Sequence, residues 1–157
     1  MDQEFIDNIQ ELLDSDAVQR LKKYTHHKTG TRFEHCLYVS YRSYKLAKLL
    51  GLDSASAARG GLLHDLFFYD WRDPEPGRGW HVTAHPRRAL IEATKRFELN
   101  EIEKDIIVKH MWPMSPWMPK YAESFVVSTM DKYCAMMEGL VTGKRKLTKM
   151  GLAHLTV

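Results

Sequence analysis

The chain is poor in cysteine and has no long hydrophobic run. Its two cysteines, Cys36 and Cys134, cannot build a disulfide framework and are typical of a reducing compartment. We interpret both as small buried core residues rather than as soft metal ligands, because free cysteine is among the most buried residue types. No apolar run approaches the roughly 18 residues of a membrane-spanning helix, and the first residues, Met1 to Glu4, do not resemble a secretory leader. We therefore expect a cytoplasmic protein without a membrane partner.

A strong excess of one charge is also lacking. The net charge is +3 at pH 7, which is too small to favour nucleic acid as a partner. Basic residues do gather near the C-terminus, at positions 144–149. We interpret this segment as a solvated tail rather than as a patch that attracts phosphate.

Apolar residues recur at helical spacing along the chain, and no segment shows the sustained alternation of a strand. Two segments rich in proline, 73–79 and 111–119, predict irregular loops between the helices. The expected helices cover about residues 5–13, 16–21, 33–50, 53–65, 86–97, 100–110 and 121–140. The chain is therefore predicted to form an all-α bundle as a single domain over residues 1–157. Its core is expected at about 20–140, with a short N-terminal helix and a basic C-terminal tail.

A histidine–aspartate pair stands in an otherwise apolar part of the chain. His64 and Asp65 follow the segment Ala57–Leu63 and precede Leu66–Phe68. Burying such a pair is costly unless something replaces its lost hydration. A divalent cation does so through imidazole and carboxylate ligation. Adjacent residues on a helix point about 100° apart, so both side chains can reach one or two ions beside the helix.

His35 and Asp131 lie on two other expected helices and complete a set of ligands for one ion. Ligands in the cores of helical bundles come from facing helices in this way. Asp131 could instead pair with Lys132 on the surface. Its neighbours at helical spacing are apolar, however, so we expect it to face inward, where an unpaired carboxylate would be costly.

Two further histidines, His85 and His110, are expected at helix ends beside the predicted loops. With Asp65 bridging, they would extend the site to two ions. We favour His85 over His81 as the ligand, because Pro86 is expected to begin the helix there. His81 then remains an alternative ligand or a hydrogen-bonding partner of the substrate. The other histidines lack this context and are interpreted as surface residues: His26, His27 and His154.

The order of these residues, His35, His64-Asp65 and Asp131, resembles the HD superfamily of metal-dependent phosphohydrolases. The sequence Ala-Arg-Gly-Gly-Leu-Leu-His-Asp looks like the signature helix of that family, and the likeness covers about residues 20–140. It implies an all-α HD fold, a compact helical bundle, and phosphohydrolase activity that depends on a divalent metal.

The additional His85 and His110 resemble those of the subset of this family that binds two metal ions, commonly iron. The subset includes bacterial symmetrical dinucleoside-tetraphosphate hydrolases and cyclic-di-GMP phosphodiesterases. The resemblance implies one or two divalent ions, with Fe or Mn favoured and Zn, Ni, Co or Mg as alternatives. The metal ligands that it implies are His35, His64, Asp65, His85, His110 and Asp131.

The chain departs from the family pattern in two places that concern the substrate. Many relatives carry a lysine three residues after the HisAsp aspartate, where this chain has Phe68. The Gly-Tyr-Pro signature of the cyclic-di-GMP branch is absent, which argues against that substrate. We expect Arg32 and Lys132 to be the first contacts to phosphate, with His81 also near the substrate. Trp112 belongs to a group of aromatic residues that either stack a base or cap the rim of the core.

The expected function is hydrolysis of a phosphoester or phosphoanhydride of a small phosphorylated metabolite, such as a nucleotide, by metal-activated water. His64 and Asp65 are the predicted catalytic residues. One alternative is a diiron oxygenase of the HD fold, which uses the same ligands to activate oxygen. Another is a non-catalytic domain that senses a nucleotide, although a sensor has less need of an intact ligand set. The sequence is also compatible with a homodimer.

Overall fold

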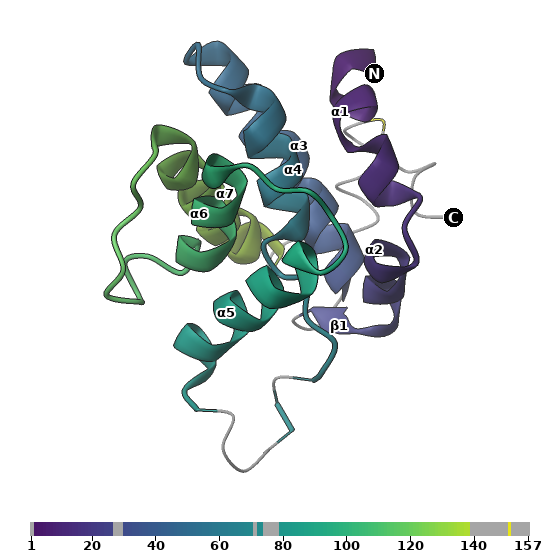
Figure 1. The fold of residues 1–157 in the computed structure, drawn as a ribbon, viewed down its shortest axis with the longest axis vertical. Helices are drawn as coiled ribbons and strands as arrows, with labels where there is room; N and C mark the ends of the chain where they lie inside the picture. The colour runs from purple at the N-terminus through teal and green to yellow at the C-terminus, as the bar shows by residue number, and fades with distance from the viewer. Residues whose placement is uncertain (1, 27–29, 71, 74–78, 139–150, 152–157) are drawn as a thin grey trace.

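The computed structural model describes residues 2–26, 30–70, 72–73, 79–138 and 151. In this part of the chain, seven α-helices are joined to one turn of 3-10 helix and a pair of two-residue strands (Figure 1). The prediction of an all-α bundle is thereby confirmed. The helices are α1 (Gln3–Leu13), α2 (Asp16–Arg20), α3 (Arg32–Leu49), α4 (Ser54–Leu63), α5 (His81–Thr94), α6 (Glu101–Lys109) and α7 (Ala122–Glu138). The 3-10 helix is η1 (Leu21–Lys23), and the antiparallel strands are β1 (Thr25–His26) and β2 (Gly30–Thr31).

Polar side chains fix the starts of three helices. Thr31 and Glu34 form a capping box at the start of α3, in which each side chain binds the backbone N–H of the other residue. Asn100 and Glu103 do the same for α6. The Asp53 carboxylate accepts a hydrogen bond from a backbone N–H in the first turn of α4. These starts agree with the predicted ones.

Two predicted boundaries are wrong. α4 ends just before His64, which is its C-cap, so Asp65 lies beyond the helix rather than inside it. α5 begins at His81 rather than at Pro86, because the Trp80 carbonyl accepts the first hydrogen bonds of the helix. Proline removes the N–H of its own position only, so a turn of helix can precede it.

The second predicted loop, residues 111–119, contains turns and bends and no helix or strand. The basic tail at 144–149, the end of the predicted helix 121–140, most of the first loop, His27 and His154 lie outside the described residues. None of the helices that the structure describes is long and apolar enough to cross a lipid bilayer.

α4 occupies the middle of the bundle. It packs against α1, α3, α6 and α7, while α5 packs against α6 (Figure 1). The sequence of α4 suits this position, because the small residues Ala57, Ala58, Gly60 and Gly61 let its neighbours approach closely. The C-terminal end of α4, with His64, is therefore surrounded by other helices.

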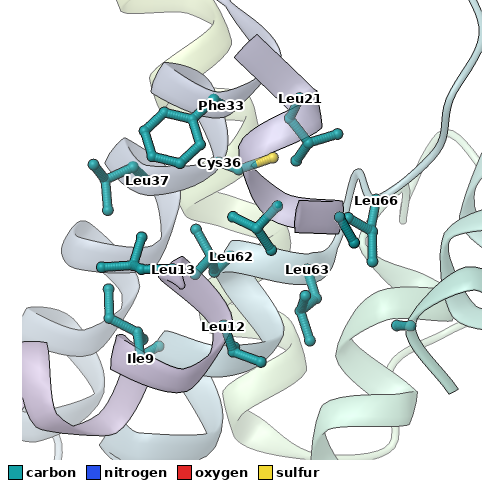
Figure 2. Close-up of a cluster of buried hydrophobic side chains, with 14 of the residues drawn as sticks. Ile9, Leu12, Leu13, Leu21, Phe33, Cys36, Leu37, Leu62, Leu63 and Leu66 are labelled. Atoms are coloured by element: carbon teal, nitrogen blue, oxygen red, sulfur yellow. The ribbon is translucent and has the colours of Figure 1, made fainter. Parts of the chain in front are cut away.

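The main hydrophobic cluster holds the N-terminal half of the chain together. Figure 2 shows side chains from α1, η1, α3 and α4 meeting in this cluster. Leu12, Leu37 and Leu62 are fully buried in it, and burying one such side chain contributes about 1.5–3 kcal/mol. Cys36 lies among them, and both Cys36 and Cys134 are buried free thiols, as expected of core residues.

Gly61 allows α3 and α4 to approach closely. A Cβ atom added at this position would lie 3.0 Å from Cα and 3.3 Å from N of Ser40 on α3, and backbone atoms cannot rotate away. The Gly61→Val side chain therefore has to push the helices apart, which costs about 1–3 kcal/mol in a packed core. We expect this loss in the free energy of unfolding measured with urea.

Ala55→Val is the matched control, because residue 55 lies on the same helix but is partly exposed. Valine at that position costs only its lower helix propensity, about 0.5 kcal/mol. Equal stabilities of the two variants would contradict the close contact between α3 and α4.

Candidate metal centre

Five helices deliver the six predicted ligands to one region of the molecule. They are His35 on α3, His64 at the end of α4 with Asp65 directly after it, His85 on α5, His110 at the end of α6 and Asp131 on α7. All six residues are buried. The bundle thus brings together side chains that are far apart in the sequence.

The Asp65 carboxylate lies between three of the histidines. Its Oδ1 atom is 3.3 Å from His85 Nε2 and 3.5 Å from His110 Nε2. Its Oδ2 atom is 3.9 Å from His64 Nε2. The two oxygens therefore face different partners.

The Asp131 carboxylate organises the other side of the cluster. Its Oδ1 atom lies 3.0 Å from His35 Nε2 and 3.5 Å from His64 Nε2. The ligand atoms of His35, His64 and Asp131 all lie within 4.8 Å of one another, and so do those of His64, Asp65 and His110. Two groups of three candidate ligands thus share His64.

Hydrogen bonds fix which nitrogen of the imidazole rings faces the cluster. In three histidines the Nδ1 atom lies next to a backbone carbonyl, which can only accept, so Nδ1 carries the proton. The three pairs are His64 with Gly61 O at 2.7 Å, His85 with His81 O at 2.7 Å and His110 with Ile107 O at 2.8 Å. When these rings are neutral, each presents an Nε2 lone pair to the cluster, which is the usual arrangement of metal-binding histidines.

The arrangement leaves lone pairs facing one another. The Nε2 atoms of His85 and His110 are 2.9 Å apart, and neither has a proton to share when both rings are neutral with the proton on Nδ1. His64 Nε2 and Asp65 Oδ1 are buried and have no hydrogen-bond partner. Each such orphaned atom costs about 1–3 kcal/mol. A divalent cation accepts electron pairs from all four atoms, so these residues fit such an ion.

The neighbouring histidines keep both carboxyl groups ionised. Burial raises the pKa of Asp65, but His64 and His85 outweigh burial and hold that pKa well below its usual range. Burial also raises the pKa of Asp131, but the neighbouring His35 and His64 outweigh burial and hold that pKa well below its usual range. Burial lowers the pKa of His110, so its ring is neutral, as a metal ligand must be.

His35 differs from the other candidate ligands because carboxylates flank both of its nitrogens. Glu138 lies 2.8 Å from Nδ1, and Asp131 lies 3.0 Å from Nε2. Burial lowers the pKa of His35, but the two carboxylates outweigh burial and raise that pKa to about 10. An ion that binds Nε2 therefore displaces a proton from this ring.

A cavity of about 250 Å³ opens onto the two aspartates, and Arg32 lies in its wall. The Arg32 guanidinium lies over the Phe67 ring, 3.6 Å from its centroid. It donates hydrogen bonds to the carbonyls of Phe67 and Tyr69 at 2.5 Å and 3.1 Å. Arg32 therefore holds the segment after Asp65 against α3 and places a positive charge at the cavity wall.

Lys132 also lines the cavity. Its ammonium is 3.3 Å from Asp131 Oδ2 and 3.2 Å from Ser128 Oγ, and it donates a hydrogen bond to the His110 carbonyl. Burial lowers the pKa of Lys132. This side chain therefore ties α7 to the end of α6 right beside the candidate ligands.

The other two predicted substrate contacts lie in different places. His81 lines the cavity, and its ring stacks on His85 with ring centroids 4.3 Å apart. Trp112 packs edge-on against Phe125, with centroids 5.3 Å apart. Trp112 is not among the described residues that line this cavity.

The interpretation of His26 as a surface residue is wrong. Its side chain is only 13% exposed, and its ring stacks on His35 with centroids 3.8 Å apart. Its Nδ1 atom lies 2.9 Å from the carboxylate of Glu138, a residue that the sequence analysis missed. The β1–β2 hairpin folds His26 back beside α3, which no local pattern reveals. Glu138 did carry a signal, because it follows Asp131 by about two helical turns on the same face of α7.

A family model described as HD domain matches residues 32–136. All six predicted ligands lie within these residues, while His26 and Glu138 lie outside them. No curated protein and no solved structure matches the chain.

Proposed function

Since the chain belongs to the HD domain family, whose members are generally metal-dependent hydrolases, we propose that it is a phosphohydrolase. It cleaves a phosphoester or phosphoanhydride of a small phosphorylated metabolite, such as a nucleotide, with one or two divalent ions, Fe or Mn. The observation that carries this proposal is the convergence of orphaned imidazole and carboxylate atoms in one buried cluster. Such a set of donors suits a divalent cation better than any hydrogen-bonding arrangement.

His64 and Asp65 have the central roles in this proposal. Asp65 directs Oδ1 toward His85 and His110 and Oδ2 toward His64. One carboxylate can therefore contribute an oxygen atom on each side of the centre. His64 lies between the carboxylates of Asp65 and Asp131. Bound divalent ions would lower the pKa of a metal-bound water and neutralise charge on a phosphoryl oxygen.

Arg32 and Lys132 supply the positive charges for a phosphate at this centre. Both line the cavity next to the two aspartates. Both are already oriented by backbone carbonyls, so little freedom is lost when an anion arrives. Phe68, at the position where many relatives have a lysine, instead lies under the guanidinium of Arg20, 4.6 Å from its ring centroid.

The size and walls of the cavity favour a small substrate. Its volume of about 250 Å³ is below the 300–1,000 Å³ that is common for drug-sized ligands. Phe67, Met111, Met114 and Ala135 give it apolar walls beside the charged groups. A single phosphate with one ring or short apolar group fits this description better than a dinucleoside polyphosphate.

The test is a metal analysis of the purified protein followed by a screen for phosphate release. The screen covers nucleoside mono-, di- and triphosphates, sugar phosphates and dinucleoside polyphosphates, each with Mn²⁺ or Fe²⁺ added. We expect bound divalent metal and metal-dependent release of phosphate from one of the small substrates.

Two other outcomes would contradict the proposal. Consumption of oxygen by the iron-loaded protein without phosphate release would identify an oxygenase. A nucleotide that raises the melting temperature but is not turned over would identify a sensor.

A further inference from the structure

His26 lies at the metal centre because of the short hairpin that precedes α3. In the β1–β2 pair, His26 stands opposite Gly30, and the chain enters α3 directly after Thr31. In this position the His26 ring stacks on the His35 ring, with centroids 3.8 Å apart and an angle of 17° between the planes. The two imidazoles are therefore nearly parallel neighbours.

One carboxylate holds both rings. Glu138 Oε2 lies 2.9 Å from His26 Nδ1, and Glu138 Oε1 lies 2.8 Å from His35 Nδ1. An ionised carboxylate can only accept, so the Nδ1 atoms of both rings donate to it. A carboxylate on the far nitrogen is a common way to orient a metal-binding histidine. His26 thus has the same support as His35, which is one of the expected ligands.

The other nitrogen of His26 points to the centre. Its Nε2 atom lies 4.0 Å from Asp65 Oδ2, the oxygen directed away from His85 and His110. One ligand atom from each of His26, His35 and Asp65 lies within 4.8 Å of the other two. Two ligands that are each about 2.0–2.2 Å from a shared ion lie about 3–4 Å apart, so the observed separation suits a common ion.

We propose that His26 is a further ligand of the metal centre, binding an ion through Nε2 together with His35 and Asp65, and that Glu138 positions both histidines. This proposal rests on the proposed metal-dependent function, because it adds a ligand to the same centre. It gives the centre an imidazole that lies outside the matched HD domain, residues 32–136. The side of the site that contains His35 is then completed by a residue of strand β1 rather than by a helical residue.

The test measures binding of Mn²⁺ to the full chain by competition with a chelator, and the absorption spectrum of the Co²⁺-loaded protein. His26→Phe keeps an aromatic ring on His35 but removes both nitrogens. We expect this variant to bind Mn²⁺ about 10–100-fold more weakly at one site and to change the Co²⁺ spectrum. Glu138→Gln should weaken the same site, because it loses the charge that orients the two rings.

Thr25→Val is the matched control, since Thr25 directly precedes His26 on strand β1 but is exposed. It should keep the Mn²⁺ affinity of the unchanged protein. Circular dichroism and urea unfolding establish that the variants are folded. A folded His26→Phe protein with unchanged Mn²⁺ affinity and Co²⁺ spectrum would overturn the ligand role while leaving the proposed hydrolase intact. Failure of the proposed function itself would appear separately, as metal binding without phosphate release by the unchanged protein.

Discussion

We expect the Asp65→Asn variant to release phosphate at least about a thousand-fold more slowly than the unchanged protein. The two carboxylate oxygens of Asp65 face different halves of the centre, with Oδ1 3.3 Å from His85 Nε2 and Oδ2 3.9 Å from His64 Nε2. Asparagine keeps the shape of the side chain but removes its charge and replaces one oxygen by an amide nitrogen. One half of the centre thus loses its anionic ligand. The quantity to measure is kcat with the best substrate of the screen.

Asp70→Asn is the matched control for this loss. Asp70 lies just downstream of Asp65, is partly exposed and forms an ion pair with Arg72 at 2.7 Å. An exposed pair of this kind contributes little, so the variant should keep the rate of the unchanged protein. If Asp65→Asn retained more than about a tenth of the original kcat, Asp65 would have no place in the catalytic centre.

Removal of the metal ions with a chelator is expected to abolish activity and to lower the melting temperature by about 5–10 °C. Without an ion, the Nε2 lone pairs of His85 and His110 face each other, and that of His64 is buried without a partner. An ion at a hundred times its Kd adds about 2.7 kcal/mol to the stability of the folded state. Thermal unfolding with a chelator, and again after the return of excess Mn²⁺, measures the shift.

The Asp65→Asn protein is also informative in this experiment. With one anionic ligand removed, it should bind ions more weakly and show a smaller change on chelation. A melting temperature that does not respond to the chelator or to Mn²⁺ in the unchanged protein would mean that the folded cluster holds no cation. The buried Nε2 atoms would then have to be protonated, and the proposed function would be wrong.

Sequence reasoning located the helices that carry the candidate ligands because the signals of these helices are local. The capping residue Asn100, for example, marks the start of α6 directly. His64 and Asp65 stand out because they are polar residues in an apolar segment, where burial needs a compensating partner. The start of α5 was misjudged because Pro86 is a first-turn signal, but its constraint acts only on its own N–H and on the carbonyl one turn before it.

His26 could not be found in this way, because its position depends on distant parts of the chain. It belongs to a strand of two residues, which has no periodicity to read. Its carboxylate partner Glu138 is 112 residues away. The backbone contacts of Arg32 could not be predicted either. Arg32 was expected to contact phosphate, but its guanidinium also binds two carbonyls that follow Asp65. Only the folded bundle brings these carbonyls within reach of Arg32.

The ends of α4 and α6 have a further consequence for the order of events. Both helices terminate at the cluster, with His64 and His110 as their C-caps. A helix C-terminus carries a partial charge of about −0.5, so these two ends add to the negative potential of Asp65 and Asp131. Before metal binds, this potential attracts cations to the cluster, while Arg32 and Lys132 keep positive charge at the cavity wall. We therefore expect divalent cations to bind to the cluster in the absence of substrate, before a phosphorylated metabolite occupies the cavity.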